Sequence, residues 1–193
     1  MTTVSGDFVL TMDELRVVAR YVLGSAEGVL HVFEEATPGD PRPRAAINAA
    51  GDFVSGARRT NLQRVTSLDA HRAAKEATTE AARLAARAAG DAASAAYLHP
   101  IAKATQVGHI LRAAASAARI GELGADDDSA VGLRLIEEAR QRATPVLIEV
   151  LNRYPAAPTG KSRTAQLMTL LDASLRMPRR TAGSTAGRSR PHG

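Results

Sequence analysis

An alanine-rich stretch between residues 78 and 119 constrains the fold of this sequence more than any other feature. Alanine is the strongest helix former, and its single methyl group lets neighbouring helices pack backbone close to backbone. Nowhere in the chain do strand-forming residues gather into alternating runs bounded by turn pairs. The sequence therefore predicts an all-α protein, folded as a single compact bundle of seven to eight helices.

The fourth of these helices, over about residues 79–98, is the most informative one. Nearly all of its positions are alanine, so we expect other helices to cover most of its surface. Its few polar side chains recur every three or four residues and form one narrow stripe, which consists of Glu80, Arg83, Arg87, Asp91 and Ser94. We therefore expect this helix at the centre of the bundle.

Local signals indicate where several helices begin. Thr11 and Glu14 have the spacing of a capping box, and Thr60 begins a second one. The first box is expected to open a long helix that continues to the turn at residues 37–39. Pro100 is expected to open or kink the fifth helix, because proline is tolerated in the first turn of a helix and disrupts its interior.

These boundaries divide the chain into three parts: a flexible N-terminus over residues 1–10, an all-helical domain over 11–177, and a disordered tail over 178–193. The tail is rich in Arg, Gly, Ser and Pro, and it holds four of the five net positive charges. Its arginines, from Arg179 to Arg190, could attract phosphate in a salt-sensitive way, which makes nucleic-acid binding an alternative function. We favour a solvated terminus instead, so nucleic acid is not an expected partner.

Several kinds of chemistry find no support in the sequence. Without cysteine, disulfides and thiolate metal sites are excluded. Neither a signal peptide nor an apolar run of membrane-spanning length is visible, so we expect a cytoplasmic protein with no membrane partner. The segment 155–162 imitates a phosphate-binding loop, but Pro155 stands where the loop requires glycine. No Ser-His-Asp set or paired carboxylates appear, so the sequence predicts no catalytic residues and no enzyme.

Three histidines lie in the central region, at His71, His99 and His109. No two of them have the three- or four-residue spacing of metal ligands on a helix, and arginines lie beside His71 and His109. We therefore expect no metal and no cofactor. A histidine-based metal or ligand site is kept as a further alternative function.

Three stretches carry a resemblance to a known family. They are DPRPRAAI at residues 40–47, YLHPIAKATQVGHIL at 97–111, and RATPV at 142–146 followed by NRYP at 152–155. With the alanine-rich centre among them, they resemble the immunity-protein family of bacterial polymorphic toxin systems that is named after its fifth immunity class. The resemblance covers about residues 10–177. It implies a small cytoplasmic α-helical protein that binds a cognate protein toxin and neutralises it stoichiometrically.

Five residues are the candidate contacts for such a toxin. Two lie in the turn before the second helix, and three lie on a polar stripe of the central region: Arg42, Arg44, His71, Gln106 and His109. The alternative for the two arginines is a structural role, in which they pair with Glu34 or Glu35. The alternative for the histidines is that they are polar residues in a groove between helices or simply surface residues.

Overall fold

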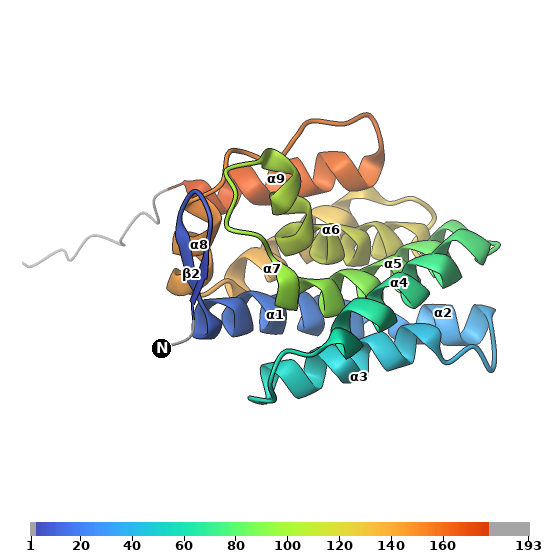
Figure 1. The fold of residues 1–193 in the computed structure, drawn as a ribbon. Helices are drawn as coiled ribbons and strands as arrows, with labels where there is room; N and C mark the ends of the chain where they lie inside the picture. The colour runs from blue at the N-terminus through green and yellow to red at the C-terminus, as the bar shows by residue number, and fades with distance from the viewer. Residues whose placement is uncertain (1–2, 178–193) are drawn as a thin grey trace, which may run out of the picture.

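The computed structural model describes residues 3–177 and confirms the all-α fold (Figure 1). This part of the chain contains nine α-helices, two short 3-10 helices and one two-stranded hairpin. In chain order they are β1 Thr3–Ser5, β2 Val9–Thr11, α1 Met12–Glu27, α2 Leu30–Ala36, α3 Arg42–Val54, α4 Asn61–Glu76, α5 Glu80–Ser94, η1 Ala95–Tyr97, η2 Ala104–Gln106, α6 Val107–Leu123, α7 Ser129–Arg142, α8 Pro145–Asn152 and α9 Arg163–Arg176. The expected tail, residues 178–193, lies outside the described residues.

The described part has more helices than the expected seven to eight, because the long first helix is broken. α1 ends before Gly28, and Val29 leaves the helical region with φ −120° and ψ 1° before α2 begins. Glycine is a poor helix former, which favours a break at this point. The capping boxes that begin at Thr11 and Thr60 are both formed, as predicted.

Residues 3–11 form a β-hairpin, where the sequence analysis expects a flexible segment up to residue 10. β1 and β2 pair antiparallel, and Leu10 is fully buried. The loop between them is fixed through Asp7, whose N–H donates to the carbonyl of Pro100 at 2.8 Å and whose carboxylate accepts from the N–H of Ala102 at 2.7 Å. Strands of three residues are too short to show the alternation that identifies a strand in a sequence.

The same contacts explain why the fifth predicted helix starts late. The sequence predicts its start at Pro100, but α6 begins only at residue 107, after the 3-10 turn η2. The carbonyl of Pro100 accepts from the N–H of Asp7, whereas a helix that starts at this residue would use it for the N–H of residue 104. The buried residues of α6 therefore begin only at residue 107, and they include Gly108, Leu111, Ala115 and Ala118.

The start of the chain is also bonded to a residue near the end of the fold. Arg153, directly after α8, donates to the carbonyl of Val9 at 3.0 Å and to the carboxylate of Glu14 at 2.6 Å. The other oxygen of Glu14 accepts from the N–H of Thr11 at 2.7 Å and completes the cap of α1. The bond from Arg153 lowers the pKa of Glu14, against the opposing effect of burial. One carboxylate thus joins the cap of α1 to α8.

α5 lies at the centre of the bundle, as its alanine content predicts. It contacts α1, α2, α3, α4 and α6, and Figure 1 shows it running between α4 and α6. Ala85, Ala89 and Ala92 have no solvent exposure. Small side chains are required at these positions because five helices approach the same one.

α7 and α9 pack on α6 and on each other. A buried carboxylate, Glu122 of α6, lies at their junction with 1% of its side chain exposed. It accepts hydrogen bonds from Arg163 of α9 and from Arg119, one turn earlier on α6. Gly132 of α7 leaves room for this carboxylate, since a Cβ atom at that position would overlap Glu122.

Candidate functional site

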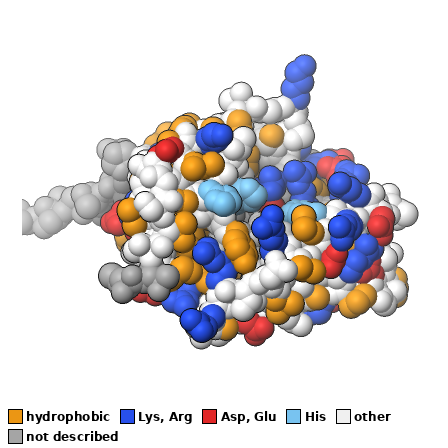
Figure 2. All heavy atoms as spheres, viewed as in Figure 1, with side chains coloured by type: hydrophobic (Ala, Val, Ile, Leu, Met, Phe, Trp, Pro, Cys, Tyr) orange, Lys and Arg blue, Asp and Glu red, His pale blue; other side chains and the backbone are white. Residues whose placement is uncertain are grey.

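A hollow lies between α4, α5 and the first half of α6, with a volume of about 410 Å³. One alanine and five ionisable side chains line it, and together they are named the basic cleft: His71, Ala74, Lys75, Arg83, Arg87 and Arg112. Figure 2 shows histidine side chains on this face of the molecule with Lys and Arg side chains gathered beside them. The three helices that form the basic cleft are thus the ones with the strongest sequence signals.

A buried carboxylate lies next to the basic cleft. Asp91 of α5 has no solvent exposure, and Arg112 of α6 binds both of its oxygens. The distance from the Arg112 Nε to the Asp91 Oδ2 is 2.8 Å. Such bidentate pairs hold both side chains in a fixed geometry. Because 24% of the Arg112 side chain is exposed, this arginine connects the buried carboxylate to the surface of the basic cleft.

His71 of α4 is the second group beside this carboxylate, with its Nε2 atom 3.8 Å from the Oδ1 of Asp91. The ring lies against the backbone of α5 at Gly90, where a Cβ atom would come within 2.9 Å of it. Burial lowers the pKa of His71; Asp91 opposes this effect, and the surrounding cations add to it. The ring is therefore neutral at pH 7.

His109 of α6 lies close to the same carboxylate. Its Nδ1 atom is 3.4 Å from the hydroxyl of Ser94 on α5. Burial lowers its pKa, and the charge of Asp91 opposes that shift. The structure thus brings His71 and His109 together around Asp91. Gln106, by contrast, is buried, and its side-chain oxygen accepts from the backbone N–H of His99 at 3.2 Å, so it holds the loop before α6.

Arg42 and Arg44 lie at the start of α3, outside the basic cleft, and both form ion pairs. The Nη2 atom of Arg42 is 2.6 Å from Asp40 and 2.5 Å from Glu76, the last residue of α4. The Nη2 atom of Arg44 is 2.7 Å from Glu34. The structural alternative for Arg44 is therefore observed, whereas Arg42 binds acids other than the two that the sequence analysis weighs.

Three cations of the basic cleft form no ion pair within residues 3–177. They are Lys75, Arg83 and Arg87, while Arg112 is paired with Asp91. Burial lowers the pKa of Arg87, repulsion by Arg112 adds to the shift, and Asp91 opposes it. The basic cleft therefore carries more positive charge than its one buried carboxylate balances.

Two of the stretches that carry the resemblance border this face, because α3 begins in residues 40–47 and α6 begins in residues 97–111. A family model described as "Imm-5 like putative immunity protein" matches residues 9–119, more than half of the chain. The chain belongs to this family. No curated protein and no solved structure matches it.

The segment that matches the Imm-5 like family contains the whole basic cleft. It runs from β2 into α6, and it includes Asp91, Arg112 and all five candidate contacts of the sequence analysis. It is shorter than the resemblance over residues 10–177 that the sequence analysis expects. α7, α8 and α9 lie outside the matched segment.

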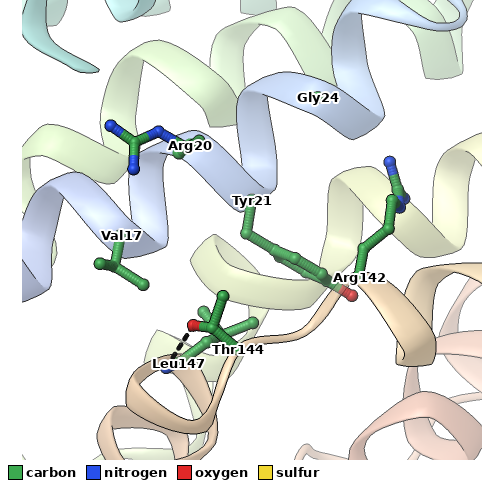
Figure 3. Close-up of a pocket in the computed structure, with 7 residues that line it drawn as sticks. All are labelled: Val17, Arg20, Tyr21, Gly24, Arg142, Thr144 and Leu147. Atoms are coloured by element: carbon green, nitrogen blue, oxygen red, sulfur yellow. Dashed lines mark hydrogen bonds between the residues drawn. The ribbon is translucent and has the colours of Figure 1, made fainter. Parts of the chain in front are cut away.

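Two further hollows lie along α1. The smaller one has a volume of about 230 Å³, and its seven lining residues are shown in Figure 3. There the hydroxyl of Tyr21 donates to the carbonyl of Ala139 at 3.2 Å, and burial raises the pKa of Tyr21 to about 12. Arg142 lies over the Tyr21 ring and donates to Ser25 at 3.1 Å. A larger hollow of about 770 Å³ continues between α1, α2, α6 and α7. Because Tyr21 and Arg142 form their hydrogen bonds within the fold, we assign these side chains a structural role.

The described residues give no support for a metal site or for a membrane span. No group of three or more His, Asp or Glu side chains in residues 3–177 could hold a metal ion. Within the same residues, no helix combines the length and apolar character needed to cross a membrane.

The centre of this site is not among the residues predicted from the sequence. Arg83, Arg87 and Asp91 are expected there only as members of the polar stripe of the central helix, and Arg112 only as one of the arginines beside His71 and His109. The available signal is a stripe that holds two carboxylates, Glu80 and Asp91, together with two arginines. Pairing Asp91 with Arg112 additionally requires the register between α5 and α6, which no local pattern contains.

Proposed function

We propose that this member of the Imm-5 like family is an immunity protein, which binds a cognate protein toxin and neutralises it in a stoichiometric complex. The observation that carries the proposal is the family match over residues 9–119, which reaches from β2 almost to the end of α6. Neutralisation by complex formation requires a complementary surface and not a catalytic group. We therefore expect no catalysis, no cofactor and no metal, and a complex that forms in the cytoplasm.

The proposed contact surface lies on the side of the fold formed by α3, α4 and α6. His71 and His109 are partly exposed, and His71 lies beside cations that have no acidic partner. Arg42 extends this surface, because its bond to Glu76 joins the start of α3 to the end of α4. Arg44 adjoins it, and Gln106 supports it from within by holding the loop before α6.

Growth protection tests this proposal. We expect that co-expression with the toxin encoded by an adjacent reading frame restores growth, and that the two purified proteins form a complex of defined stoichiometry by light scattering after size-exclusion chromatography. Substitution of His109→Ala should weaken the complex and leave the helical fold intact, as measured by circular dichroism. Arg134→Gln on α7, outside the family segment, is the matched control and should have no effect.

Two results would refute the proposal. One is continued growth arrest in the presence of folded protein, which would show that the chain does not neutralise that toxin. The other is full protection when the toxin is present in large molar excess, because a stoichiometric inhibitor cannot act on more toxin than it binds. The second result would indicate catalysis.

A further inference from the structure

The basic cleft has an unbalanced charge that the fold itself does not neutralise. Four permanent cations line it, and one carboxylate, Asp91, lies beside it with both oxygens bound to Arg112. The remaining three cations converge on one hollow from two helices: Lys75 from α4, and Arg83 and Arg87 from α5. Like charges at close range repel one another, which raises the free energy of the empty cleft.

The acidic residues of the same two helices cannot relieve this repulsion, because each is already bound to a cation other than Lys75, Arg83 and Arg87. On α4, Asp69 binds Arg72 and Glu76 binds Arg42. On α5, Glu80 binds Arg119, and Asp91 binds Arg112. α4 and α5 contain no other carboxylate. The basic cleft therefore lacks a neutralising group of its own and is suited to an anion that comes from outside the chain.

We propose that the basic cleft is a binding site for a phosphate-bearing ligand. A phosphate group brings a charge of about −1.5 to −2 and three acceptor oxygens to one point. A single carboxylate brings one charge and would leave two of the three free cations unpaired. Guanidinium groups bind phosphate with two parallel hydrogen bonds, and lysine binds it as a point charge. The volume of about 410 Å³ lies in the range of small-molecule sites.

His71 and Arg112 complete the site on the side of Asp91. Arg112 is held by its bidentate bond, so it is already oriented when a ligand arrives. The ring of His71 is fixed against Gly90 and lines the same hollow, which makes it a local reporter of occupancy. Ala74 is the one lining residue without a polar side chain. The side chains that line the basic cleft can bind the charged phosphate group of the ligand. They provide no contact that is specific for a base or a sugar.

Titration calorimetry and NMR with the full chain test this proposal, with pyrophosphate as the probe. We expect one binding site in the basic cleft, a shift of the His71 ring signals on binding, and a higher midpoint of thermal unfolding with pyrophosphate. Arg83→Gln with Arg87→Gln should weaken binding by about tenfold or more for each arginine, as for the loss of a hydrogen bond to a charged group. Both side chains are exposed and unpaired, and their removal relieves repulsion, so the thermal midpoint of this variant without ligand should not fall.

The matched control removes two arginines of α7, outside the cleft, as Arg134→Gln with Arg140→Gln, and should bind pyrophosphate like the unaltered chain. The proposal is overturned if this control loses the binding, if the cleft variant keeps it, or if citrate binds as tightly as pyrophosphate. A single-stranded oligonucleotide distinguishes two sources of phosphate. If it binds and the cleft variant weakens it, the source is nucleic acid; if pyrophosphate alone binds, the source is a small phosphorylated molecule.

Discussion

Replacement of Asp91 by asparagine isolates the contribution of the buried ion pair between α5 and α6. Asparagine preserves the shape of the side chain and removes its charge, so no cavity forms. Arg112 then remains in place with 24% of its side chain exposed and without a counter-ion. Removing one partner of a buried pair destabilises a protein by about 3–5 kcal/mol, because it leaves a charge that is neither paired nor fully hydrated.

The partial exposure of Arg112 places the expected loss at the lower end, at about 3 kcal/mol. For a domain of this size, 1 kcal/mol corresponds to about 2–4 °C in the midpoint of thermal unfolding. Asp91→Asn should therefore lower that midpoint by about 6–12 °C. The double variant with Arg112→Met should lose less than the sum of the two single variants, by about 1–3 kcal/mol, because the two residues are in direct contact.

Chemical and thermal denaturation, followed by circular dichroism at pH 7.5, measure all four proteins of this cycle. The control is Asp69→Asn on α4, which breaks the exposed pair with Arg72 and should change stability by no more than about 1 kcal/mol. A loss for Asp91→Asn that is as small as this control would refute the reasoning. Strictly additive losses in the cycle would refute it too, because they would show that the two residues act independently.

Two further predictions concern Gly132 and the histidines. Gly132→Ala should destabilise the fold by about 1–3 kcal/mol in urea unfolding, because its Cβ atom would overlap the buried Glu122, whereas Gly51→Ala, with open space around it, should stabilise α3 by up to about 1 kcal/mol. Burial lowers the pKa values of His71 and His109 below 6.5 in the folded state. Their contribution to the free energy of unfolding is therefore complete above pH 6.5, and it is lost as the pH falls through these folded-state pKa values. The unfolding free energy should therefore decrease from pH 7.5 to 5.5, and the decrease should be smaller when both are alanine.

Much of the helical fold could be predicted because its signals are local. The polar stripe and the alanines of α5 lie on one helix, so their spacing alone gives the covered and uncovered sides. The threonines at positions 11 and 60 each bond within their own first turn. The hairpin and the late start of α6 depend instead on Asp7 and the chain near Pro100, which are more than ninety residues apart.

The candidate site could be predicted only in part, for the same reason. His71 and His109 stand out in the sequence because histidine is rare in it, and the structure places both near Asp91. The role of Asp91 itself depends on the register between α5 and α6. Whether Arg87 has an acidic partner depends on which cations the neighbouring carboxylates bind. Such contacts between helices leave no periodic signal along the chain.

The bond between Arg153 and Glu14 has a consequence for folding during synthesis. A ribosome releases the chain from its N-terminus, so residue 14 emerges long before residue 153 does. Until Arg153 emerges, the carbonyl of Val9 and one oxygen of Glu14 lack their native partner. Closing a loop of this length also has an entropic cost, and the bond that offsets it forms only after Arg153 has emerged. A nascent chain that stalled before Arg153 would contain the entire segment shared with the family and still lack the bond that fixes its first helix.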